Sequence, residues 1–190
     1  LLPGLREHTC SRGRRGGFVE RLHEGTWLGH VAEHAALALQ QVVGHDIRRG
    51  KTRQVKGVPG RYNIIYGYVD EQVGLAAARL AVRLVNHLVE ADPEFDFEAE
   101  LEQFILRAER TAFGPSTQAI LDEAVSRDIP WIRLNKYSLV QLGQGVHQKR
   151  IRATMTSATS AIAVDVASDK DLTTRLLGAA GLPVPKQESV

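Results

Sequence analysis

Apolar residues in the first 111 positions recur every three or four residues, which is the pattern of amphipathic helices. This pattern predicts helices at 18–22, 28–43, 71–90 and about 96–111. Asp70 is expected to cap the third helix, and the apolar stripe of that helix is expected to pack on the preceding sheet. Residues 61–69 alternate instead, and one side of them carries Tyr62, Ile64, Tyr66 and Tyr68, as in a strand. The first part of the chain is therefore predicted to be an α+β domain.

Gly114 and Pro115 stop the fourth helix, and the character of the sequence changes after them. We place a domain boundary there, which divides the chain into 1–113 and 114–190. The second part is predicted to contain helices at 116–127, 160–167 and 170–180, and short strands at 130–134, 139–142 and 148–153. This alternation predicts the fold class α/β, with an α+β domain followed by an α/β domain. The chain ends where a further strand is expected, so the second domain is predicted to be incomplete.

The composition, with 43% hydrophobic and 24% charged residues among 190, predicts a folded chain. No apolar run approaches the roughly 20 residues that cross a bilayer, so no membrane partner is expected. The single cysteine, Cys10, cannot form an internal disulfide, which favours a reducing, cytoplasmic location. A net charge of +2 is too small to indicate nucleic-acid binding, and the basic residues of the first third are interpreted as solvated loops. The start lacks both Met and a signal peptide, and is predicted to be truncated.

Candidate chemistry is clearest in the segment His30-Val-Ala-Glu-His34, inside the second predicted helix. Histidines at i and i+4 share one helix face, so both can reach one zinc ion, and Glu33 beside them can act as general base for a water. This is the spacing of the inverted zincin motif. Glu71 is the expected third ligand, with Asp70 as second choice. The alternative is that His30 and His34 are polar residues at a helix-packing surface.

Two further segments contain groups that suit anions. Gly143 and Gly145 permit a tight turn before Gln148, Lys149 and Arg150, whose donors fit carboxylates or phosphates; the alternative is a basic β-hairpin. The hydroxyl-rich segment 156–160 and the segment 168–175 lead into helices, where Lys170 could add a charge toward phosphate. Helix capping explains these hydroxyls equally well.

Together these stretches resemble cyanophycin synthetase, the enzyme family that builds a polymer with an aspartate backbone and arginine side chains. The resemblance in the first part is carried by Leu2-Pro-Gly-Leu5, Glu7-His8, Gly16-Gly-Phe-Val19, Glu24-Gly-Thr-Trp-Leu-Gly-His30, Glu33-His34 and Gly50-Lys-Thr-Arg53. In the second part it is carried by Gly114-Pro-Ser-Thr117, Ser138-Leu-Val-Gln-Leu-Gly143, the run Thr156 to Asp165, and Asp169-Lys170 through Pro185.

The resemblance implies an N-terminal domain at 1–113 and the opening of an ATP-grasp ligase domain at 114–190. The family uses ATP and Mg²⁺ to activate the polymer's terminal carboxylate as an acyl phosphate, which the amine of aspartate attacks. Lys170 would bind the ATP phosphates, and the polymer end would lie against Gln148, Arg150, Ser157 and Ser160. The remaining nucleotide-binding residues are expected beyond Val190, so this chain alone is not expected to ligate. A homo-oligomer is expected for the full-length enzyme.

In some members the N-terminal domain is also similar to a zinc metallopeptidase that cuts the polymer into primers. That similarity implies zinc bound by His30, His34 and Glu71, with Glu33 as base. The alternative is a non-catalytic domain whose basic loops hold the polymer through its carboxylates. Nucleic-acid binding ranks last, because the basic segments lack interleaved aromatic residues.

Overall fold

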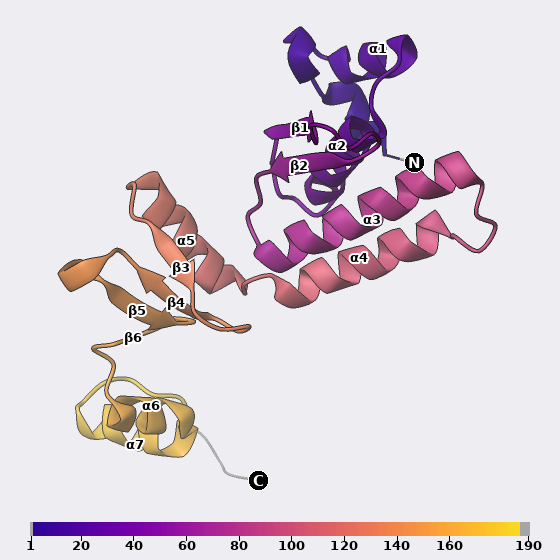
Figure 1. Cartoon of the computed structure of the whole chain (residues 1–190). Helices are drawn as coiled ribbons and strands as arrows, with labels where there is room; N and C mark the ends of the chain where they lie inside the picture. Colours follow the sequence, from indigo (N-terminus) through magenta and orange to yellow (C-terminus); the bar gives the residue numbers. More distant parts are fainter. Residues whose placement is uncertain (1, 187–190) are drawn as a thin grey trace. The chain divides into compact units, whose positions relative to one another are not determined.

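The computed structural model describes residues 2–186, which fall into two compact units, Leu1–Ala112 and Phe113–Val190 (Figure 1). Each unit combines helices with an antiparallel sheet, of two strands in the first and four in the second. The predicted class, a mixture of α and β structure, is confirmed. Within residues 2–186, no helix combines the length and the hydropathy that a bilayer-spanning segment needs.

Over residues 2–112, unit 1 contains two short 3-10 helices, four α-helices and a β-hairpin. In chain order these are η1 (Pro3–Glu7), η2 (Cys10–Arg12), α1 (Gly17–Glu24), α2 (Leu28–Val42), β1 (Gly50–Gln54), β2 (Tyr62–Tyr66), α3 (Glu71–Glu90) and α4 (Phe97–Thr111). The four predicted helices and the strand β2 are confirmed. Strand β1, which pairs with β2 from Gly50↔Tyr66 to Gln54↔Tyr62, was not predicted.

Helix α2 forms the centre of unit 1, and its residues from Ala32 to Gln40 are all buried. One side of α2 contacts β1 and β2, and another contacts α3, which in turn packs on α4. The α3 stripe thus packs mainly on α2 and not, as predicted, mainly on the sheet, although Tyr66 of β2 reaches α3 and donates a hydrogen bond to the carbonyl of Gly74 at 2.7 Å. The reason is that α2 is apolar around most of its circumference and takes the central position itself. At the end of the stripe, Leu88 is 63% exposed.

Local signals set the ends and the close contacts of these elements. The Asp70 carboxylate accepts hydrogen bonds from the backbone N–H groups of Gln72 (2.9 Å) and Val73 (3.1 Å), as a helix cap predicts. Such a cap contributes about 1 kcal/mol to stability. Gly29 lets the hairpin approach α2, because a Cβ there would lie 2.7 Å from Cβ of Tyr62. The hairpin therefore lies directly over the first turns of α2, the predicted metal-binding helix.

Unit 2 begins with a helix that packs on a small sheet. Its elements are α5 (Pro115–Ser126), β3 (Trp131–Arg133), β4 (Leu139–Leu142), η3 (Gly145–His147), β5 (Lys149–Arg152), β6 (Met155–Thr156), α6 (Ala161–Ser168) and α7 (Lys170–Ala179). The strand order is β3-β4-β5-β6, all antiparallel, and the core consists of Leu121, Val140 and Ile151. The three predicted helices and the three predicted strands are confirmed, whereas η3 and β6 were not predicted.

Candidate metal centre

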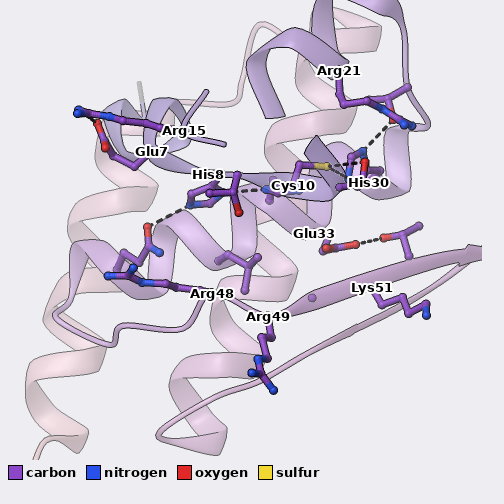
Figure 2. A pocket seen from close by; sticks show the side chains of 18 of the residues that line it. Glu7, His8, Cys10, Arg15, Arg21, His30, Glu33, Arg48, Arg49 and Lys51 are labelled. Carbon is purple, nitrogen blue, oxygen red and sulfur yellow. Dashed lines mark hydrogen bonds and ion pairs between the residues drawn. The ribbon is translucent and has the colours of Figure 1, made fainter. Parts of the chain in front are cut away.

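A cavity of about 1090 Å³ opens in unit 1 beside helix α2. It is lined by the N-terminal 3-10 segment, by one face of α2, and by the start of β1 (Figure 2). His30 and Glu33 on α2 both line it, as the spacing of the motif predicts for one helix face. The cavity therefore brings together segments that lie up to 45 residues apart in sequence, from Glu7 to Thr52.

Cys10, His30 and His34 form a cluster in this cavity that could hold a metal ion, with one ligand atom from each within 4.8 Å of the others. The Sγ atom of Cys10 lies 3.3 Å from Nε2 of His30 (Figure 2). Cys10 begins η2 with a left-handed backbone at φ 48°, a conformation that costs a non-glycine residue about 1–2 kcal/mol. The fold thus holds the backbone of Cys10 in an unfavourable conformation, and this conformation places the thiol beside the histidines.

The donor set fits zinc, which is bound by thiolate sulfur and imidazole nitrogen and needs three protein ligands in catalytic sites. Burial lowers the pKa of His34 to about 3, with smaller contributions from His30 and His8. Burial also lowers the pKa of His30, with a further contribution from the charge of Arg21. Both rings are therefore neutral near pH 7, which is the form that binds metal.

Glu33 lies between the two histidines in sequence and is only 3% exposed. The hydroxyl of Thr52 on β1 donates a hydrogen bond to Oε2 of Glu33 at 2.6 Å. Burial raises the pKa of Glu33, and the hydrogen bond from Thr52 acts in the opposite direction. A carboxylate with a raised pKa beside a metal cluster is the group expected of a general base.

Phe18 closes the interior side of the cluster, where it is fully buried. Its ring stacks on His34 with a centroid distance of 4.0 Å and meets His30 edge-on at 5.7 Å. The Phe18 backbone N–H donates to the carbonyl of His8 at 3.1 Å. The same residue therefore orients both histidines and ties α1 to the segment that carries Cys10.

Cations surround the cavity on several sides. Arg15 pairs with Glu7 and Arg48 pairs with Asp46. Three other lining cations form no ion pair within residues 2–186: Arg21, Arg49 and Lys51. In the view of Figure 2, Arg21 lies on one side of Cys10 and Glu33, and Arg49 and Lys51 on the other. The cavity consequently suits a ligand that carries negative groups.

The third ligand expected from the sequence, Glu71, lies elsewhere in unit 1. It is exposed at the first position of α3 and is not among the residues that line the cavity. The second choice, Asp70, serves as the cap of α3. Cys10 is the residue that the structure brings to the two histidines. The available signal was that Cys10 is the only cysteine and thus the only thiolate ligand the chain could offer.

The residues proposed for the ligase reaction all lie in unit 2. Gln148 follows η3, and Arg150 lies on β5, where its carbonyl accepts a hydrogen bond from the backbone N–H of Ser157 at 3.2 Å. Ser160 caps α6 by accepting from the N–H of Ala163 at 3.0 Å. Lys170 is exposed at the first position of α7. Their roles toward ATP and polymer stay predictions.

Residues 1–90 match the family model described as "Cyanophycin synthase-like N-terminal domain". This match covers slightly less than half of the chain. Over 192 residues the chain is 46% identical to a cyanophycin synthetase of Synechocystis sp., in an alignment that covers 100% of this chain and 22% of the relative. It is 44% identical to a cyanophycin synthetase of Crocosphaera subtropica with the same coverage, and 42% identical to one of Nostoc sp. over 97% of this chain and 21% of the relative.

These findings confirm the predicted resemblance to cyanophycin synthetase. The chain spans about a fifth of the length of the curated relatives it matches. The Cys10–His30–His34 cluster, Glu33 and Thr52 all lie between positions 10 and 52, inside the segment that matches the family model. The similarity to the relatives also continues through unit 2, because the alignments cover nearly the whole chain.

Proposed function

We propose that this chain is the N-terminal portion of an ATP-dependent ligase that joins aspartate and arginine into cyanophycin. The observation that supports this proposal is the 46% identity to a cyanophycin synthetase along the entire chain, in both units. In this reaction a carboxylate oxygen at the polymer end attacks the γ-phosphate of ATP, and ADP leaves. The amine of the incoming amino acid then attacks the acyl carbon, and phosphate leaves as the amide bond forms.

Unit 2 supplies groups for the first of these steps. The Lys170 ammonium would neutralise charge on the transferring phosphoryl group together with Mg²⁺, since such reactions depend on positioning and charge neutralisation. Gln148 and Arg150 offer donors to the carboxylate of the polymer end, and Ser157 and Ser160 offer hydroxyls from the segment that follows.

A chimera tests this proposal. The chain replaces the aligned 192 residues of the Synechocystis relative, and incorporation of aspartate and arginine is measured with ATP and a primer. We expect ATP-dependent polymer growth that Lys170→Ala reduces, with the exposed surface variant Lys136→Ala as the matched control. A folded chimera that fails to extend the primer would contradict the assignment of this chain to the ligase.

A second function is supported by the geometry of unit 1. We propose that its cavity is a zinc-dependent peptidase centre that cuts cyanophycin, with Cys10, His30 and His34 as the metal-binding residues. The donor set supports this proposal, because one thiolate and two neutral imidazoles leave a fourth position for water or substrate. Zinc held by these three residues would supply a water that is nucleophilic near neutral pH and a Lewis acid for the scissile carbonyl.

Glu33 is the residue that moves protons in this proposal. Its carboxylate takes a proton from the attacking water and returns it to the amine of the departing fragment. Thr52 holds one carboxylate oxygen, Oε2, and leaves Oε1 for that exchange. Arg21, Arg49 and Lys51 would bind the free carboxylates that the arginine side chains of the polymer carry. These cations are the same groups that a non-catalytic polymer-binding domain would use.

Metal content and polymer cleavage separate catalysis from binding alone. We expect about one zinc per wild-type chain and release of soluble fragments from cyanophycin. Glu33→Gln should keep the zinc and lose cleavage, whereas Cys10→Ala should lose both. His147→Ala, which changes an exposed histidine of unit 2, is the matched control and should lose neither. If the chain binds the polymer but holds no zinc and does not cleave it, the peptidase proposal is contradicted, and the non-catalytic polymer-binding domain is the function that remains.

A further inference from the structure

His8 lies in the turn between η1 and η2, and neither the proposed peptidase reaction nor the metal cluster uses it. It is 8% exposed, and its Nδ1 atom lies 2.8 Å from Nδ1 of His34. On its other side, Nε2 of His8 lies 3.1 Å from Oε1 of Gln41. His8 therefore bridges a residue of the metal cluster and a glutamine about two turns further along α2.

The amide of Gln41 fixes the direction of the hydrogen bonds in this bridge. Its Nε2 donates to the backbone carbonyl of Ile47 at 3.2 Å, so the oxygen is the atom that faces His8. An amide oxygen only accepts hydrogen bonds. The proton of a neutral His8 ring must then be on Nε2, which leaves a lone pair on Nδ1.

The 2.8 Å contact between the two Nδ1 atoms now has one possible donor. Because Nδ1 of His8 accepts, Nδ1 of His34 must carry the proton. A neutral His34 ring protonated at Nδ1 has its lone pair on Nε2. That nitrogen is therefore the one able to bind a metal.

We infer that His8 is a positioning residue that fixes His34 in the Nδ1-protonated tautomer and so presents Nε2 of His34 to the metal. The role in metal binding rests on the proposed metal centre. The direction of the hydrogen bond from His34 to His8 does not, because both residues make this contact in the metal-free chain. Ligand histidines commonly hold their second nitrogen through such an outer partner, which sets the tautomer and ring orientation.

His30 shows the same arrangement through a different residue. Its Nδ1 lies 2.8 Å from the hydroxyl of Thr26, and its Nε2 faces Cys10 at 3.3 Å. Both histidines are thus held at Nδ1 by partners outside the cluster, which leaves Nε2 of each for the ion. Thr26 comes from the residues before α2 and His8 from the N-terminal turn, so two separate segments perform the same task.

The first test measures the tautomer directly. Long-range ¹H–¹⁵N spectra of the metal-free chain, with His34 assigned by comparison with His34→Ala, distinguish a protonated Nδ1 from a protonated Nε2. We expect the Nδ1-protonated form in the wild type. His8→Leu removes the acceptor and should let His34 sample both forms. His8→Asn keeps an acceptor oxygen near the position of Nδ1 and should preserve the wild-type tautomer.

The second test measures zinc affinity by competition with a chelator. His8→Leu should weaken zinc binding by roughly 10- to 100-fold, the range typical for loss of an outer partner. His8→Asn should stay near the wild-type affinity, as should His23→Asn, which changes an exposed histidine of the same unit. Equal affinities in His8→Leu and wild type would overturn the positioning role.

The two tests separate failure of this inference from failure of the proposed peptidase. A wild-type chain that binds no zinc would contradict the peptidase, and the spectra would still decide the role of His8. A wild-type His34 protonated at Nε2 would overturn the inference even if zinc binds. Should His8→Leu fail to fold, the wild-type spectra and the His8→Asn variant still give the answer.

Discussion

Gly50 lies directly against Glu33, so that a Cβ at position 50 would stand 2.6 Å from Oε1 and 2.8 Å from Cγ of the carboxylate side chain. Gly50 begins β1, and the same strand provides Thr52, which binds the other oxygen of Glu33. The absence of a side chain at position 50 therefore defines the space in which the proposed general base lies.

Substituting Gly50→Ala should displace Glu33 without changing a metal-binding residue. The new methyl group meets the whole end of the side chain, so rotation of the carboxylate alone does not relieve the contact. We expect zinc content to stay near wild type and cyanophycin cleavage to fall by about 10²-fold, the effect of moving a catalytic group by about 1 Å. Parallel zinc analysis and cleavage assays measure this difference.

Gly67→Ala is the matched control for that variant. It lies just after the partner strand, and its added Cβ would meet only Ile47 at 3.4 Å, an ordinary contact. We expect cleavage by Gly67→Ala near the wild-type rate. An unchanged rate in Gly50→Ala would show that the position of Glu33 does not matter to the reaction.

Gly17 allows α1 to pack closely against the N-terminal turn that carries His8 and Cys10. A Cβ there would lie 2.2 Å from the carbonyl oxygen of Thr9, the residue between His8 and Cys10. Because that oxygen belongs to the backbone, Gly17→Ala must push the N-terminal turn away from α1. We expect a loss of about 1–3 kcal/mol in the free energy of unfolding, as for overpacking, together with a lower zinc content.

Denaturant unfolding and metal analysis measure these two effects. Gly114→Ala is the control, since a Cβ at that position meets nothing within 4 Å. Its stability should stay within about 0.5 kcal/mol of wild type, as for a surface substitution. If Gly17→Ala is destabilised but keeps the wild-type zinc content, the contact between position 17 and Thr9 does not determine where Cys10 lies, and this prediction is wrong.

Much of unit 1 could be predicted because its signals are local. Asp70 and the stripe that follows it define α3, and the alternation of Tyr62, Ile64 and Tyr66 gives β2. Strand β1 lacks such a signal, since Lys51 and Arg53 make it resemble a solvated loop. It is a strand because β2 supplies its hydrogen-bond partners.

The candidate site was likewise predictable only where its residues are close in sequence. His30, Glu33 and His34 share one helix, so their spacing already places them together. Cys10 lies 20 residues before His30, and 3-10 turns and a left-handed backbone bring it there. No periodic pattern encodes that path, and the contact could be found only once the fold was known.

Tyr66 makes the stability of unit 1 sensitive to high pH. Its hydroxyl donates to the carbonyl of Gly74 at 2.7 Å, and burial raises the pKa of Tyr66 above its usual value of 10. The folded state therefore holds this proton more tightly than the unfolded chain. The resulting contribution to stability is complete below about pH 10 and is lost as the pH rises through the folded-state pKa.

Tyr66→Phe should reduce that alkaline loss. At neutral pH it should cost about 1 kcal/mol, the typical value for one hydrogen bond. Unfolding by urea between pH 7 and 11 measures both effects. Tyr68→Phe, at a position 57% exposed, is the control and should keep the wild-type pH profile. An identical alkaline decline in Tyr66→Phe and wild type would assign the decline to other groups.

Cobalt(II) in place of zinc tests whether Cys10 is a metal ligand. A thiolate bound to cobalt gives a charge-transfer absorption in the near ultraviolet, which histidine and carboxylate ligands do not give. We expect this band in the wild-type chain and in Glu33→Gln, because Glu33 is not a ligand. Cys10→Ala should lose the band and should bind cobalt more weakly, since only His30 and His34 remain of the cluster.

Glu71→Gln completes this comparison, because the sequence alone favoured Glu71 as the third ligand. Exposed on α3 and outside the cavity lining, Glu71 should be replaceable with no change in band intensity or metal affinity. If cobalt instead binds to Cys10→Ala with wild-type affinity and fails to bind to Glu71→Gln, the third ligand is the carboxylate. The cavity would then have to close over the start of α3, and the cysteine would be a neighbour of the metal rather than its ligand.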